Sequence, residues 1–164
     1  MKAEDYKRLV RLYVPEAAFI QGKNLSLSEG QAHYLRNVMR KSAGDALRVF
    51  NGQDGDWLAT VAEINKKKAL VKLDHQLLEQ KQSPYVWVLA SPVKKEAFDL
   101  MIEKSCELGA AKFIPVTCEH TVVHKINQER LQAIAIEAAE QSERLDVMTV
   151  EPLSDLKKCL NSFD

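Results

Sequence analysis

Long apolar segments and paired cysteines are missing from this sequence. No apolar run reaches the ~18 residues that a membrane-spanning helix needs, and acidic and basic residues are mixed at the start with no apolar segment after them. We therefore expect no membrane partner and no secretory leader, which places the protein in the cytoplasm. The cysteines, Cys106, Cys118 and Cys159, show no C-x-x-C spacing. This spacing predicts reduced thiols rather than a disulfide framework.

Glycine-rich nucleotide loops are missing as well. The sequence has six glycines and contains no G-x-G-x-x-G, no P-loop and no G-x-S-x-G, so it shows no complete cofactor site. A zinc site from Cys118, His120 and His124 is a weak hypothesis, because structural zinc takes four ligands at tight spacing. The two valines between the histidines favour extended chain rather than a helix that would align them. We expect no metal.

Charge is balanced over the chain but not along it. Residues 1–74 hold 13 Lys and Arg against 9 Asp and Glu, while residues 75–164 hold 10 against 14. A basic front half suits a polyanionic partner, although a mixed solvated surface produces the same modest excess.

Short alternating segments and one helix fill the first 74 residues. Ser28 to Gln31 forms a capping box, which predicts a helix from Glu29 to Arg40 with Ala32, Leu35 and Met39 buried. The expected strands are 12–14, 46–50, 57–64 and 69–73. This spacing favours a small antiparallel barrel over residues 1–74.

The pattern changes after a polar linker at residues 75–84. Residues 85–164 read as strand 85–90, helix 96–108, strand 113–117, helix 127–144, strand 147–150 and helix 154–160. This βαβαβα order predicts a parallel sheet with right-handed crossovers. Pro115 in the second strand suggests an edge position or a bulge.

Two groups of residues are candidates for binding. His33, Arg36, Asn37 and Arg40 share one face of the first helix and Lys41 follows, which suits contact with phosphates but equally an ordinary solvated face. Ligands of open α/β sheets bind beyond the carboxyl ends of the strands. Those ends carry Lys94 and Lys95 in one loop and Glu119 and His120 in the next, although residue types alone favour solvated lysines and a turn there.

Several stretches, in this order and spacing, resemble one family. They are Arg11–Val14, His33–Arg40 with Gly44-Asp45, Phe50–Gly52, Glu103–Gly109, Ile114–Val116 and Glu137–Ser142. Together they are similar to the bacterial 16S ribosomal RNA (uracil-N3) methyltransferases, the E enzymes of the small-subunit series. The similarity covers about residues 9–160, nearly the whole chain.

The resemblance implies an α+β protein with an N-terminal PUA-like barrel that binds RNA and a C-terminal SPOUT domain with a trefoil knot. It implies S-adenosylmethionine as the cofactor, one uridine in 16S rRNA of the small ribosomal subunit as the target, and a homodimer for the full-length form. The residues implied for RNA contact are Arg11, Tyr13, His33, Arg36, Arg40 and Lys41. Lys94, Glu119, His120, Glu137 and Gln141 are candidates for the active edge or dimer seam.

The sequence departs from the family in one large respect. The family's Gly-Pro-Glu-Gly-Gly loop and its later Leu-Arg-x-Glu-Thr-Ala segment, which build the knot and the methyl-donor pocket, do not occur before Asp164. We therefore expect a C-terminally truncated SPOUT domain, with cofactor-binding residues beyond Asp164 and no catalytic base assignable among the residues present. The alternatives are a non-catalytic RNA-binding module derived from that family, and a two-domain protein with no role in nucleic-acid binding.

Overall fold

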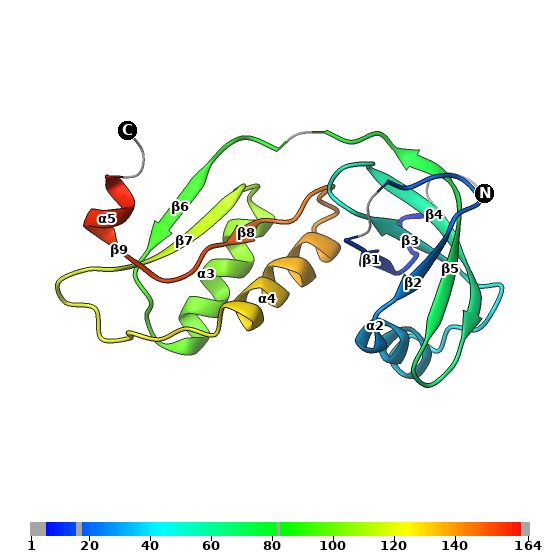
Figure 1. Cartoon of the computed structure of the whole chain (residues 1–164), viewed down its shortest axis with the longest axis horizontal. Helices are drawn as coiled ribbons and strands as arrows, with labels where there is room; N and C mark the ends of the chain where they lie inside the picture. Colours follow the sequence, from blue (N-terminus) through cyan, green and yellow to red (C-terminus); the bar gives the residue numbers. More distant parts are fainter. Residues whose placement is uncertain (1–5, 16–17, 82, 162–164) are drawn as a thin grey trace. The chain divides into compact units, whose positions relative to one another are not determined.

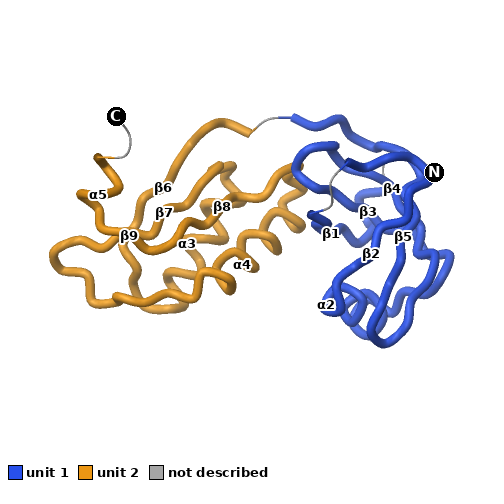
Figure 2. The backbone as a smooth tube through the Cα atoms, in the orientation of Figure 1, with its two compact units in different colours: residues 1–81 blue, residues 82–164 orange. Residues whose placement is uncertain are grey.

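The chain folds into two units, each built on a sheet of its own. The computed structural model describes residues 6–15, 18–81 and 83–161. Unit 1 spans residues 1–81 and unit 2 spans residues 82–164 (Figure 2). Both units combine strands with helices (Figure 1), so the expected α+β class is confirmed. Among the described residues, no helix has the length and apolar character to cross a membrane.

Unit 1 is built on a five-stranded sheet in the order β1-β3-β4-β5-β2. Its core consists of alternate apolar side chains of these strands with Ala32 and Leu35 of the first helix. All neighbours are antiparallel except β1 and β3, which pair in parallel. The sheet is therefore mixed rather than antiparallel throughout. The strands are β1 (Arg11–Tyr13), β2 (Asn24–Leu27), β3 (Ala46–Phe50), β4 (Asp56–Ile64) and β5 (Ala69–Leu78).

Strand β5 runs further than the sequence suggests. His75 and Gln76, which the polar composition assigns to a linker, pair with Leu58 and Trp57 of β4. A side chain at Gly55 would place its Cβ 2.0 Å from the carbonyl oxygen of Leu78, at a φ of +75°. Glycine is the residue that permits this close approach. The end of β5 is thus held against the turn before β4, and a polar surface strand was mistaken for a linker.

The predicted first helix changes its geometry halfway. Ser28 caps α2 (Glu29–His33) with the predicted capping box, and a π-helical turn, η1 (Tyr34–Val38), continues it. The amide of Met39 donates to the carbonyl of Tyr34 at 3.0 Å, which is the i→i+5 pattern of a π-turn. The wider turn rotates the following residues off the 3.6-residue period, so Met39 is 39% exposed instead of buried.

A buried ionic cluster joins β1, β3 and β4. Asp56 is fully buried, and its carboxylate contacts the guanidinium groups of Arg11 and Arg48. Arg48 Nε donates to Asp56 Oδ2 at 2.8 Å, and Arg11 Nε lies 3.4 Å from Oδ1. The guanidinium carbon of Arg11 also stacks 3.7 Å from the ring centroid of Phe50. Parallel pairing of β1 with β3 sets Arg11 beside Arg48 and produces this arrangement.

Unit 2 is a parallel sheet whose strands alternate with helices, as predicted. The sheet has the order β6-β7-β8, and β9 also pairs with β7. The strands are β6 (Trp87–Ala90), β7 (Lys112–Thr117), β8 (Thr149–Val150) and β9 (Ser154–Asp155). The helices are α3 (Lys95–Glu107), α4 (Gln128–Gln141) and α5 (Leu156–Leu160). The last predicted helix is therefore preceded by a short strand.

Pro115 lies in the central strand, so the predicted edge position is wrong. β8 pairs with β7 at Lys112 and Phe113, whereas β9 pairs with it at Val116 and Thr117. Pro115 stands where the pairing changes from one partner to the other. Its missing N–H therefore interrupts no continuous ladder on that side.

The two faces of this sheet carry different layers. Phe113 points toward α3, where its ring centroid lies 5.7 Å from that of Phe98. α3 and α4 lie together on this face (Figure 1). Ile114 and Val116, which alternate with Phe113, pack with Cys159 of α5. Helix α4 ends at Gln141, three residues earlier than predicted. Beyond it, the buried Arg144 donates to the carbonyls of Cys106 and Ala110 at 2.6 and 2.8 Å.

Candidate functional site

The predicted basic helix face of unit 1 is exposed. His33, Arg36 and Arg40 are exposed, and Lys41 is half-buried. The π-turn brings the segment to an abrupt end, because the amide of Lys41 donates to the carbonyl of Leu35 at 2.8 Å and Arg40 takes a φ of +53°. This left-handed conformation is uncommon for a residue other than glycine. The helix thus presents four basic side chains over its last two turns and its closing residues.

Arg11 does not belong with these residues. Its side chain is 4% exposed and is held by the ionic cluster around Asp56. The prediction that Arg11 contacts RNA conflicts with this placement, because a buried guanidinium in an ion pair is not available to a phosphate. Tyr13 lies next to it on β1, half-buried, with its ring centroid 5.3 Å from that of Phe50. Burial raises the pKa of the Tyr13 hydroxyl above its ordinary value.

In unit 2 the two predicted loops meet at the carboxyl edge of the sheet. Ser91 follows β6, Thr121 follows β7, and their hydroxyl oxygens are 2.7 Å apart. The Thr121 hydroxyl also accepts a hydrogen bond from the amide of Cys118 at 2.7 Å. Glu119 and His120 occupy the exposed turn between Cys118 and Thr121. The structure therefore brings these two loops together, and Ser91 and Thr121 form the link that residue types alone did not single out.

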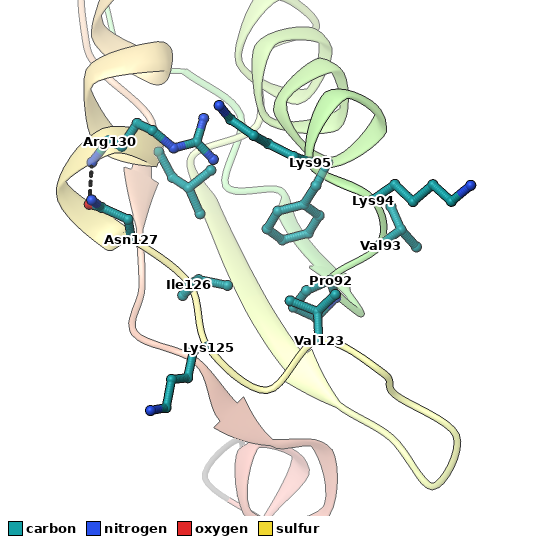
Figure 3. Close-up of a pocket in the computed structure, with 11 residues that line it drawn as sticks. Pro92, Val93, Lys94, Lys95, Val123, Lys125, Ile126, Asn127 and Arg130 are labelled. Carbon is teal, nitrogen blue, oxygen red and sulfur yellow. Dashed lines mark hydrogen bonds between the residues drawn. The ribbon is translucent and has the colours of Figure 1, made fainter.

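A cavity of about 240 Å³ lies beside these loops, between the N-terminal ends of α3 and α4 (Figure 3). Basic side chains surround an interior that is mainly apolar. It is lined by Pro92, Val93, Lys94, Lys95, Phe98, Val123, Lys125, Ile126, Asn127, Arg130 and Leu131. Sequence reasoning found Lys94 and Lys95 but missed Lys125 and Arg130. Ligands of open α/β sheets bind beyond the carboxyl ends of the strands. This rule also indicates Lys125 and Arg130, if it covers the whole loop after each strand and the first turn of the next helix.

Arg130 is fixed within this cavity. Its Nη2 donates to Asp99 Oδ1 at 2.8 Å, and its Nη1 pairs with Asp99 Oδ2. The hydrogen bonds to Asp99 raise the pKa of the Arg130 guanidinium above its ordinary value. Asn127 caps α4 by accepting from the Arg130 amide at 3.0 Å, as the sequence predicts. In contrast, Lys94, the N-cap residue of α3, makes no side-chain capping hydrogen bond.

Glu137 and Gln141 lie elsewhere. They line a second, acidic hollow between α3 and α4 with Asp99, Glu103 and Glu107. Glu137 is ten residues along the chain from the Asn127 cap, so at 1.5 Å per residue it lies roughly 15 Å up the helix axis. The structure thus separates them from the loops that carry Lys94, Glu119 and His120. No group of three or more possible metal ligands occurs among the described residues.

Comparison with known proteins identifies both units. A sequence model described as "RNA methyltransferase domain" matches residues 80–164, and one described as "RNA methyltransferase PUA domain" matches residues 27–74. The ribosomal RNA small subunit methyltransferase E of Rickettsia conorii is 33% identical over 141 residues, which is 86% of this chain and 58% of that protein. The protein of the same name from Synechocystis is 35% identical over 137 residues, covering 82% of this chain and 44% of that protein.

Solved structures agree with the sequence matches. A ribosomal RNA small subunit methyltransferase E from Neisseria gonorrhoeae, bound to S-adenosyl methionine, superposes with a TM-score of 0.83 at 27% identity. The match covers 93% of this chain and 65% of that one. The structure of a Legionella pneumophila protein in complex with the cofactor S-adenosyl methionine gives a TM-score of 0.79 at 28% identity, covering 91% of this chain and 63% of that one. The chain spans less than two thirds of these relatives, and it belongs to the RNA methyltransferase family that the ribosomal RNA small subunit methyltransferase E proteins represent.

Proposed function

We propose that this chain binds ribosomal RNA of the small subunit and serves the S-adenosylmethionine-dependent methylation of N3 of one uridine in it. The observation that carries the proposal is the order of the two matched domains, an RNA methyltransferase PUA domain followed by an RNA methyltransferase domain. Such a substrate requires a cytoplasmic location. The resemblance also supports a homodimer for the full-length form, which sedimentation analysis tests.

The chemistry assigns separate tasks to the two units. N3 of uracil lies on the Watson–Crick edge, so a paired base is closed to attack and the target must be unpaired or turned out of its stack. N3 must also lose its proton, and it must be aligned with the carbon that it attacks. In this proposal unit 1 binds the RNA and aligns it. The carboxyl edge of the sheet in unit 2 positions the target nucleotide.

The basic residues at and just after the α2–η1 segment of unit 1 suit the first task. His33, Arg36, Arg40 and Lys41 gather on one short helical segment. Contacts from such side chains to phosphates position a protein on nucleic acid without reading its sequence. The turn of Lys66, Lys67 and Lys68 between β4 and β5 adds cations to the same unit.

The cavity of unit 2 does not suit the methyl donor. Its volume of about 240 Å³ falls below the roughly 300–1,000 Å³ of sites that bury a drug-sized ligand. Its rim carries Lys94, Lys95, Lys125 and Arg130, and like charges disfavour a cationic sulfonium. The residues of this cavity therefore do not fit S-adenosylmethionine.

A methyl-transfer assay tests the proposal. The chain is incubated with small-subunit rRNA and S-adenosylmethionine labelled at the methyl group, and the RNA is then reverse-transcribed. Because methylation at N3 blocks the Watson–Crick edge, we expect label in the RNA and a transcription stop at one uridine. Label at another position would contradict the uridine-N3 assignment, while retaining a methyltransferase.

A second candidate function is RNA binding without catalysis. The misfit between the cationic cavity and a sulfonium favours it. Salt-dependent binding of the same RNA, with no label transferred and no heat of binding for S-adenosylmethionine in calorimetry, would establish this candidate for the chain. Saturable binding of S-adenosylmethionine would exclude it.

A further inference from the structure

We propose that the cavity between the N-terminal ends of α3 and α4 binds one unpaired nucleotide of the RNA. In this arrangement the base enters the apolar interior and its phosphate lies against Lys95 and Arg130. The inference rests on the proposed function, because it takes the ligand to be RNA, and it names the place on unit 2 where a nucleotide is held.

The size and lining of the cavity suit a single pyrimidine base. A volume of about 240 Å³ equals that of roughly eight water molecules at about 30 Å³ each, and uracil has about as many heavy atoms. Pro92, Phe98 and Leu131 are buried and form the floor. Val123 and Ile126 are half-buried and form the wall (Figure 3). Apolar surfaces of this kind contact the face of a base and not its hydrogen-bonding edge, so the lining does not distinguish one pyrimidine from another.

The charges stand at one side of this interior. In Figure 3 the side chains of Lys95 and Arg130 point toward one another, whereas those of Lys94 and Lys125 point away. Asp99 accepts hydrogen bonds from both terminal nitrogens of Arg130. A guanidinium has five N–H donors, so others remain available to a phosphate. The side chain of Lys95 makes no hydrogen bond or ion pair with any residue in the described part of the chain.

The backbone adds to this positive side. α3 has 13 residues and begins at Lys95 without a side-chain cap, so its first amides keep hydrogen-bonding capacity for an anion. Glu96 and Glu129 lie in the first turns of α3 and α4 and offset part of the charge. Neither of them lines the cavity. The result is an apolar slot with cations at one end, which matches a base joined to a phosphate.

Titration of the isotope-labelled chain with uridine 5′-monophosphate, followed by NMR, tests the site without relying on unit 1. We expect saturable shifts of the amides of Lys95, Ile126 and Arg130. Uridine alone and ribose 5-phosphate alone serve as the two half-ligands, and each should bind at least 5-fold more weakly. Equal binding by ribose 5-phosphate, or the absence of shifts at these amides, would overturn the proposal.

Variants separate the two halves of the site. In binding to a single-stranded oligouridine, Lys95→Ala should lower the slope of log affinity against log salt by about 0.7, the value for one phosphate contact. The double variant Val123→Ser/Ile126→Ser should weaken binding about 5-fold or more with an unchanged slope, because it removes only base contacts. Lys157→Ala on α5 and Leu100→Ser on α3, exposed and outside the cavity, are the matched controls.

These outcomes distinguish the proposal from the function on which it rests. If both cavity variants bind RNA like their controls, the cavity takes no nucleotide, yet the basic helix of unit 1 still binds RNA. If the unaltered chain binds no RNA but its cavity binds uridine 5′-monophosphate, the RNA function fails and a nucleotide site remains.

Discussion

Replacement of Asp56 by asparagine should destabilise unit 1 strongly. The asparagine side chain has nearly the same shape but no charge, so the carboxylate that Arg11 and Arg48 both contact would be lost. Their side chains are 4% and 5% exposed, and that of Asp56 is fully buried, so solvent cannot replace the lost counter-charge. Breaking a buried ion pair of this kind costs about 3–5 kcal/mol.

That loss is a large share of the stability available. Unit 1 has 81 residues, and domains are stable by roughly 0.05–0.15 kcal/mol per residue, which corresponds to about 4–12 kcal/mol here. The variant should therefore unfold at a much lower urea concentration, or be unfolded without denaturant. The slope of free energy against urea should stay the same if both proteins unfold the same surface.

Tryptophan fluorescence lets this unit be observed alone. The sequence has two tryptophans, Trp57 in unit 1 and Trp87 in unit 2, so a Trp87→Phe background leaves one reporter beside the altered residue. Glu63→Gln, at an exposed position on the same strand, is the control and should change stability by less than about 0.5 kcal/mol. A change below about 1 kcal/mol for Asp56→Asn would refute the reasoning that the carboxylate balances the two buried arginines.

Two further predictions concern the surface and the thiols. The double variant Arg36→Glu/Arg40→Glu should abolish binding to rRNA fragments at moderate salt, because it replaces two cations by anions on the proposed contact helix. The salt slope of the residual binding should fall by about 1.4–1.8. In the folded protein a thiol reagent should modify Cys118, which is exposed, much faster than Cys106 and Cys159, which are buried. Burial raises the pKa of the Cys106 thiol, so at pH 8 it stays protonated and unreactive until the protein unfolds.

Each of these has its own control. Lys66→Glu/Lys67→Glu makes the same change of charge in a turn of unit 1 outside the helix, and it should weaken RNA binding less. Equal losses from the two double variants would mean that net charge, and not the helix face, drives binding. For the thiols, urea should bring Cys106 and Cys159 to the rate of Cys118, and rapid labelling of all three before unfolding would contradict the burial.

Local features of the fold were predictable because their signals lie within a few residues. The alternation over Trp57 to Ile64 predicted β4, which begins one residue earlier at Asp56, since a strand with one buried face has a period of two. The caps at Ser28 and Asn127 were recognised because each cap bonds a backbone amide three residues ahead. The strand–helix alternation after residue 85 likewise predicted the parallel sheet of unit 2.

Features that depend on distant pairing were not predictable in this way. Strand β2 was missed because Asn24 to Leu27 is only four residues long, too short for its alternation of polar and apolar residues to stand out, and its pairing with β5 is what makes it a strand. The π-turn contains one residue more than an α-helical turn. It was missed because the spacing of apolar residues in the sequence does not show where such an extra residue lies. Pro115 was misplaced because the exchange of β8 for β9 beside it involves residues more than thirty positions later.

The same division runs through the functional residues. Sequence by itself determined that His33 and Arg36 lie close together on one helical segment, because residues three apart on a helix are neighbours whatever surrounds it. The place of Arg40 depends on the π-turn and on its own left-handed backbone, which the sequence did not predict. Only the tertiary structure decided that Arg11 is buried, since its partner Asp56 comes 45 residues later on another strand. It alone brought Lys95 and Arg130 to one cavity, because the carboxyl ends of parallel strands, and the helices that follow them, meet at one edge of the sheet.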